Sequence, residues 1–239
     1  MAQQTQVTRV VPVFERFVER FPTPRSLADA PTDAVLSAWE DLGFLRRALT
    51  LRDAATRIAE EGWPRDPRGL AELPGVGPYT AAAVACFAFG HPVPAVDVNL
   101  RRVLSRWAGE ALSPGAASRL ASELIDREHP ADWNQAVMDL SAARCRPRDP
   151  RCEACPVSSW CADPTVEVAS RRQSTFEGSV RQARAALLKA IAADGPHRAD
   201  GLAATLRLEE DQVARAVSDL VSEQILVEEA GIVRLADQS

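Results

Sequence analysis

Apolar residues recur every three or four positions along most of the chain, which is the spacing of α-helices with one buried face. The first such segment predicts an amphipathic helix whose apolar face includes Val10, Val13, Phe14, Phe17 and Val18. The same pattern predicts helices over residues 32–42, 46–61, 79–89, 100–107 and 114–129. Loops are marked by Pro22, Pro24 and Pro31. The chain is therefore predicted to be mainly α-helical.

The last part of the chain has a different pattern. Residues 162–176, which include Pro164, Arg171 and Arg172, are predicted to be a linker. Helices are then expected over 180–193, 199–206 and 210–222, followed by a hairpin of strands 225–227 and 232–235 that turns at 229–231. Three helices and a hairpin predict a small winged-helix-like domain over 177–239, beside a larger domain over 1–161.

Winged-helix domains often bind DNA, but this one begins its would-be recognition helix with Glu209-Glu210-Asp211. Carboxylates repel phosphate. We therefore favour a packing or partner-docking role for this domain over reading a DNA groove.

The stretch from residue 73 to 107 combines a turn, a helix and a second helix. The turn is Leu73-Pro74-Gly75-Val76-Gly77, in which two glycines permit positive φ and close approach of a ligand to the backbone. Pro78 suits the first turn of a helix, whose free N–H groups form an anion site. Asp97 precedes the second helix and is placed to cap it.

The overall charge argues against nucleic acid as a partner. The 239 residues are 46% hydrophobic, as in a globular protein, and carry a net charge of −5. Binding to nucleic acid would therefore require local patches of positive charge on the surface. One candidate patch is the group Arg144, Arg146, Arg148 and Arg151. No run reaches the about 18 apolar residues of a membrane span, and no signal-peptide pattern opens the chain, so we expect a cytoplasmic protein.

Four cysteines close the larger domain. Cys145, Cys152, Cys155 and Cys161 follow the spacing C-x6-C-x2-C-x5-C, whereas Cys86 lies in an apolar run and is expected to be buried. Disulfides are disfavoured in a cytosolic chain. Four thiolates in one loop indicate a soft metal, either Zn²⁺ or an iron–sulfur cluster. Zinc sites more often show two C-x2-C pairs, and here there is one.

Taken together, these motifs resemble the endonuclease III/MutY superfamily of DNA glycosylases. Within it, Gly77-Pro78-Tyr79-Thr80, Val96-Asp97-Val98-Asn99 and the opening Gln3-Gln4-Thr5-Gln6-Val7 resemble the MutY group of adenine glycosylases. The resemblance implies a helix–hairpin–helix fold and a [4Fe–4S] cluster on the four cysteines. It also implies removal of adenine mispaired with 8-oxoguanine or G in duplex DNA, by a monomeric enzyme associated with the nucleoid.

The resemblance also implies roles for residues near the turn. Lyase-type members carry a lysine in place of Tyr79, so its absence implies a monofunctional hydrolase. Asp97 would stabilise the sugar cation, Tyr79 would orient Asp97, and Asn99 would fix the nearby backbone. Backbone N–H groups at Gly75, Val76 and Gly77 would hold phosphate.

Other positions are implied to touch DNA. Gln4 matches the family's wedge glutamine, and Arg146 and Arg148 supply positive surface. Leu42 and Phe44 fall where the family contacts the base opposite adenine, but Leu42-Gly43-Phe44-Leu45 lacks the tyrosines found there, so the opposite-base preference is open. The winged-helix-like domain stands where many members carry a Nudix-like domain, so lesion recognition cannot be carried over.

Two alternatives remain at this point. The family's catalytic glutamate would lie two residues before Met1, so either the sequence starts late or the protein is a lesion binder that lacks its general acid. Alternatively, the chain is a thymine glycosylase acting on T:G mismatches, because a related group also pairs tyrosine with aspartate.

Overall fold

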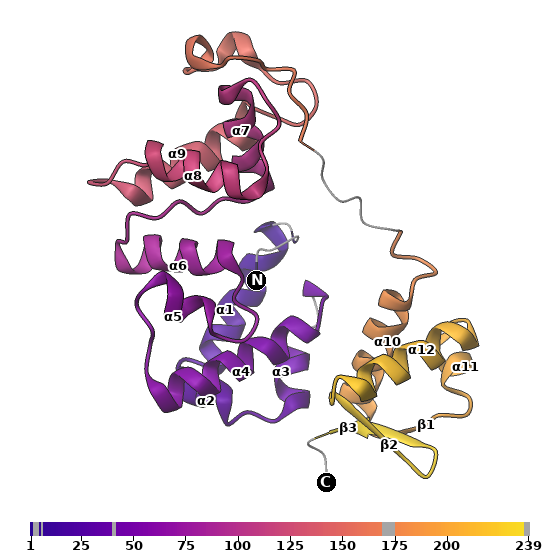
Figure 1. Ribbon diagram of the computed structural model, residues 1–239. Coiled ribbons are helices and arrows are strands. Elements are labelled where there is room, and N and C mark those ends of the chain that lie inside the picture. The colour runs from indigo at the N-terminus through magenta and orange to yellow at the C-terminus, as the bar shows by residue number, and fades with distance from the viewer. Residues whose placement is uncertain (2–4, 6, 40–41, 169–174, 237–239) are drawn as a thin grey trace. The chain divides into compact units, whose positions relative to one another are not determined.

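The computed structural model describes residues 1, 5, 7–39, 42–168 and 175–236 (Figure 1). The chain forms two compact units, which are described separately. The first unit joins Met1–Trp63 to Gln173–Ser239, and the second is Pro64–Arg172. The described part of the chain is mainly helical with one small sheet near the C-terminus, and none of its helices is long and apolar enough to cross a membrane.

The first unit begins with the helices α1 (Val7–Arg20), α2 (Pro24–Ala28), α3 (Thr32–Trp39) and α4 (Arg46–Glu61). Phe17 of α1 is buried and meets Trp39 of α3 edge-on, with ring centroids 5.7 Å apart. The predicted apolar face of α1 is only partly right. Phe14 and Val18 are 52% and 43% exposed because each lies one position, or about 100°, around the helix from a buried neighbour.

The prediction of a loop at Pro24 was wrong. Thr23 accepts a hydrogen bond from the backbone N–H of Ser26, and the Ser26 side chain accepts one from the backbone N–H of Thr23. This reciprocal cap starts α2. Pro24 therefore occupies the first turn of a helix, where its missing N–H costs nothing.

The C-terminal part of the first unit contains α10 (Val180–Asp194), α11 (Leu202–Leu206) and α12 (Glu210–Ser222). Strands β1 (His197–Arg198), β2 (Leu226–Glu229) and β3 (Ile232–Leu235) form an antiparallel sheet in the order β1-β3-β2. Ala230 and Gly231, both with positive φ, connect β2 to β3 as expected of a two-residue hairpin turn. β1 was not predicted, since two residues show no periodicity, and the helix expected over 199–206 starts only at Leu202.

α10 packs against α12 on one side and α3 on another. Buried residues of these helices, including Leu36, Leu187 and Leu220, belong to one continuous hydrophobic core. The C-terminal elements therefore share a core with the first helices of the chain.

The second unit consists of α5 (Pro67–Ala71), α6 (Pro78–Phe89), α7 (Val98–Ala108), α8 (Pro114–Leu124) and α9 (Pro130–Ala143), followed by short 3-10 turns at Cys152–Ala154 and Ser158–Trp160. Leu100 and Val103 of α7 pack on Val137 of α9, and Leu104 packs on α8. The helix predicted over 114–129 is five residues too long. The Asp126 carboxylate accepts hydrogen bonds from the backbone N–H groups of Glu128 and His129 and turns the chain toward Pro130.

Candidate functional site

Asp97 lies at the N-terminus of α7 as its capping residue. One carboxylate oxygen accepts hydrogen bonds from the backbone N–H groups of Asn99 and Leu100, both at 2.8 Å. The other accepts one from the Asn99 side-chain amide at 2.7 Å. The carboxylate is therefore fixed in one orientation, half-buried, at the positive end of a helix dipole.

Tyr79 stands in the first turn of α6 and exposes 37% of its surface. Burial, and secondarily the negative charge of Asp97, raise the pKa of its phenol above the usual value. The Tyr79 hydroxyl is therefore neutral, and it lies close enough to Asp97 to interact with its charge.

Asn134 of α9 holds the loop that leads to Asp97. Its fully buried amide accepts a hydrogen bond from Ala95 N–H at 2.8 Å and donates to the carbonyls of Val93 and Pro130. Sequence reasoning gave no role to this residue. Asn134 also donates to Cys86, which is buried as predicted, so the loop before Asp97 is fixed to both α6 and α9.

Arg102 connects Asp97 to the cysteine loop through Asn99. Its guanidinium donates to the Asn99 side-chain oxygen at 2.9 Å and to the Cys145 carbonyl at 2.9 Å. Arg102 exposes only 6% of its surface. A chain of hydrogen bonds thus runs from the carboxylate, through Asn99 and Arg102, to the first cysteine.

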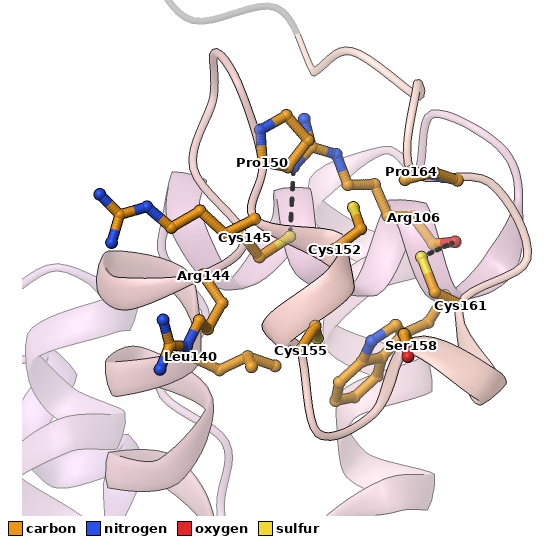
Figure 2. A pocket seen from close by; sticks show the side chains of 12 residues that line it. Arg106, Leu140, Arg144, Cys145, Pro150, Cys152, Cys155, Ser158, Cys161 and Pro164 are labelled. Carbon is orange, nitrogen blue, oxygen red and sulfur yellow. Dashed lines mark hydrogen bonds between the residues drawn. The ribbon is translucent and has the colours of Figure 1, made fainter.

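The four cysteines line a common cavity of about 70 Å³. Figure 2 shows Cys145, Cys152 and Cys161 at this cavity with Arg106 at its edge. The buried Arg106 guanidinium donates to the Cys145 sulfur at 3.2 Å and to the Arg146 carbonyl at 2.9 Å. No three His, Cys, Asp or Glu side chains of the described residues converge as closely as a single metal ion requires.

The turn between α5 and α6 presents free backbone N–H groups. Gly75 has φ of +71°, whereas Gly77 is extended, so only one of the two glycines uses the left-handed region. The Val76 N–H donates to the Leu73 carbonyl at 3.1 Å and is engaged in the turn. Within the described residues, the N–H groups of Gly75 and Gly77 donate to no other group and are exposed.

Comparison with known proteins shows the family to which this chain belongs. The HhH-GPD superfamily of base excision DNA repair proteins matches residues 1–126. The adenine DNA glycosylase of Mycobacterium tuberculosis is 41% identical over 207 residues, covering 81% of this chain and 68% of that protein. This chain belongs to the HhH-GPD superfamily. The human adenine DNA glycosylase is 39% identical over 171 residues, which are 67% of this chain and 31% of the human protein.

Solved structures of the superfamily have the same fold. A thermostable thymine-DNA glycosylase superposes with a TM-score of 0.64 and 31% identity over 67% of this chain and 78% of its own. A trapped endonuclease III–DNA covalent intermediate superposes with a TM-score of 0.62 and 25% sequence identity. The superposition covers 68% of this chain and 79% of that chain.

The side chains predicted to contact DNA differ in their exposure. Phe44 is 36% exposed, but Leu42 is 3% exposed and packs into the core, which leaves little of it to a ligand. Arg146 and Arg148 line a shallow groove with Asn99, near the capped carboxylate. Gln4 lies outside the described residues.

Proposed function

We propose that this protein is an adenine DNA glycosylase of base excision repair, which hydrolyses the N-glycosidic bond of adenine mispaired in duplex DNA. The observation that carries the proposal is the Asp97 carboxylate, held by Asn99 at the start of α7. The turn between α5 and α6 adds two backbone N–H groups, of Gly75 and Gly77, that donate to no group in the described part of the chain. The 41% identity to an adenine DNA glycosylase supports the choice of base.

Breaking the N-glycosidic bond sends its electron pair to the departing adenine, which takes up a proton, and leaves positive charge on the sugar until water adds to it. A fixed carboxylate stabilises that charge without having to reorient. Asp97 has this role in the proposal. Asn99 and the two backbone donors hold its oxygens, while the neutral Tyr79 hydroxyl orients the carboxylate. Adenine would be flipped out of the helix to reach the site.

The backbone N–H groups of Gly75 and Gly77 would hold a phosphate of the DNA, which positions the duplex without reading its sequence. Arg146 and Arg148, which line the groove with Asn99, would add positive charge nearby. Gln4 and Phe44 remain proposed contacts to the base stack and to the opposite base.

Cys145, Cys152, Cys155 and Cys161 would hold a [4Fe–4S] cluster. Four thiols that line one cavity supply the Cys₄ ligand set that holds such clusters. The cluster would supply structural support to its loop. Arg106 would donate a hydrogen bond to one cluster thiolate.

We further propose that the glycosylase domain spans residues 1–161, and that α10, α11, α12 and the small sheet form a winged-helix-like module over 177–239. The order of its elements and its two-residue hairpin support this assignment.

Analysis of the products tests the proposed chemistry. A duplex with adenine opposite 8-oxoguanine should yield free adenine and an abasic strand that breaks only after alkali. Borohydride should trap no covalent adduct, because Tyr79 cannot form the Schiff base that a lysine would form. Strand cleavage without alkali, or a trapped adduct, would contradict monofunctional hydrolysis.

A second candidate is a thymine glycosylase acting on T:G mismatches. The similarity to the thermostable thymine-DNA glycosylase favours it, with a TM-score of 0.64 and 31% identity. Release of thymine from a T:G duplex, without release of adenine, would decide for this alternative.

A further inference from the structure

The four residues before α4, which we call the Phe44 turn (residues 42–45), have a strained backbone. Gly43 and Phe44 both have left-handed backbone angles, with φ of +67° and +50°. A bulky side chain rarely adopts such an angle, and it persists there only where the surrounding structure fixes it. The conformation of Phe44 therefore depends on the contacts that hold the turn.

Part of that support comes from α3 and α4. Trp39 is 2% exposed and donates from its indole N–H to the Gly43 carbonyl at 3.1 Å. The Arg47 guanidinium lies 5.7 Å from the centre of the Trp39 ring and 5.3 Å from that of the Phe44 ring. These contacts fix the turn while the Phe44 ring stays 36% exposed.

The C-terminal module supplies apolar support for the same turn. Leu42 and Leu45 are 3% and 6% exposed and belong to the same hydrophobic core as Leu188 of α10. Leu45 and Leu188, with Leu36 of α3, line a small cavity of about 50 Å³. The two ends of the Phe44 turn are therefore anchored in a core to which α10 contributes.

An ion-pair network adds a second connection to the module. Glu223, at the end of α12, pairs through one carboxylate oxygen with Arg46 at 3.2 Å and through the other with Arg184 of α10 at 2.7 Å. The Glu223 and Arg184 side chains are only 22% and 20% exposed, so salt screens their attraction less than that of an exposed pair. Arg46 directly follows the Phe44 turn, and Glu223 therefore links that turn to α10 and α12.

We propose that the C-terminal module positions Phe44 for the base opposite the excised one, and that Glu223 is the positioning residue. Glu223 would act through Arg46 without touching DNA. A ring that is fixed before DNA binds does not have to be ordered on binding, so its contact contributes more fully to affinity. The proposal rests on the proposed function, since it assumes that Phe44 contacts the opposite base.

This role of the module does not require it to contact DNA. The helix α12, which would enter a groove in a winged-helix protein, carries Glu210 and Asp211 in its first turn and is unsuited to phosphate. The other end of α12 carries Glu223, which pairs with the first residue of α4. The module would thus affect the choice of opposite base through the Phe44 turn.

Affinities of the full chain for two duplexes test this proposal. Each fluorescent duplex carries a stable abasic analogue, which cannot be cleaved, opposite 8-oxoguanine in one and opposite cytosine in the other. Glu223→Gln should lower the ratio of the two affinities about 5-fold, through loss of part of the stacking on Phe44. A smaller fraction of folded protein would weaken binding to both duplexes equally and leave the ratio unchanged.

Further variants separate the ion pair from the ring. Arg46→Gln should lower the affinity ratio about as much as Glu223→Gln, and the double variant should lower it no further, because the two residues act as a pair. Phe44→Ala removes the ring and should lower the ratio at least as far. Glu229→Gln is the matched control, since Glu229 pairs with Arg234 at 3.2 Å in the same module, and it should keep the ratio.

Unchanged affinity ratios in both Glu223→Gln and Arg46→Gln would overturn the proposal. Equal affinity of the unchanged protein for the two duplexes would also overturn it, because there would be no discrimination to position. Neither measurement requires release of a base. A protein that releases no adenine would contradict the proposed function and leave this test intact, so the two proposals can fail separately.

Discussion

The Asp97 region and a cleft of the first unit both place charged groups where a turn meets a helix, but the charged groups have different surroundings. This arginine cleft is lined by Arg9, Arg46, Arg47, Arg181 and Arg184. Both oxygens of Asp97 are hydrogen-bonded, and a chain of polar contacts continues through Asn99 and Arg102. The arginine cleft collects five cations in a described lining that has no carboxylate. A group that stabilises a transition state must be fixed before the reaction, whereas a binding surface needs accumulated charge.

The largest expected effect comes from Asp97→Asn, which keeps the size of the side chain but removes the negative charge. The rate of adenine release should fall roughly 10³-fold, because the sugar cation loses its stabilising carboxylate. Single-turnover kinetics with excess enzyme would measure it. Asp126→Asn is the control, since Asp126 also accepts two backbone hydrogen bonds but lies away from Asp97's network, and its rate should be unchanged. Equal rates for both variants would contradict the assignment of Asp97.

A smaller effect is expected from Arg102→Gln. The change leaves the Cys145 carbonyl and the Asn99 amide oxygen without their shared donor, at a cost of about 2 kcal/mol in folding free energy. The unfolding midpoint should fall by about 4–8 °C, and both iron content and release rate should decrease. Calorimetry measures the unfolding midpoint, and iron analysis measures the iron content. Arg119→Gln, at an exposed arginine of α8, should change none of them.

Substitutions at the two glycines of the α5–α6 turn should distinguish an effect on folding from an effect on DNA binding. Gly75→Ala places a side chain at φ of +71° and should destabilise the fold by about 1–2 kcal/mol. Gly77→Ala should destabilise the fold less, since Gly77 is extended and an added Cβ meets no described protein atom within 4 Å, so that only the weaker capping by alanine remains. Its methyl would stand beside the free N–H, so affinity for duplex DNA should fall several-fold. An unchanged affinity would argue against phosphate at this turn.

The smallest effect is expected from Tyr79→Phe. Because burial and Asp97 raise the phenol pKa in the folded state, the hydroxyl stays neutral through the physiological range. Its contribution to stability is complete below the unfolded pKa of about 10 and is lost only as pH rises through the folded pKa. The variant should therefore lower the release rate only a few-fold and keep the same pH–rate profile between about pH 6 and 9. A changed profile in that range would mean that Tyr79 titrates during the reaction.

Local patterns were enough to predict much of the fold and part of the site. The long helices follow from apolar periodicity, and α12 begins and ends where it was predicted. Asp97 and the glycine turn were identifiable because capping and turn residues act on their own neighbours in sequence. The short helix α2 and strand β1 were missed because they span too few residues to show a period.

The supporting residues could not be predicted, since their partners are distant in sequence. Asn134 bonds to Ala95 across 39 residues, and Arg106 bonds to Val166 across 60. Periodicity shows which face of a helix is apolar but not what covers it. The packing of α10 against α3 is of this kind.

The most direct test of the account compares two single-turnover rates for the unchanged protein. One duplex holds adenine opposite 8-oxoguanine, and the other holds thymine opposite G, in the same flanking sequence. The account predicts release of adenine roughly 10²-fold faster than release of thymine, or more. Faster release of thymine would contradict the proposed function and assign the Asp97 site to the other mismatch.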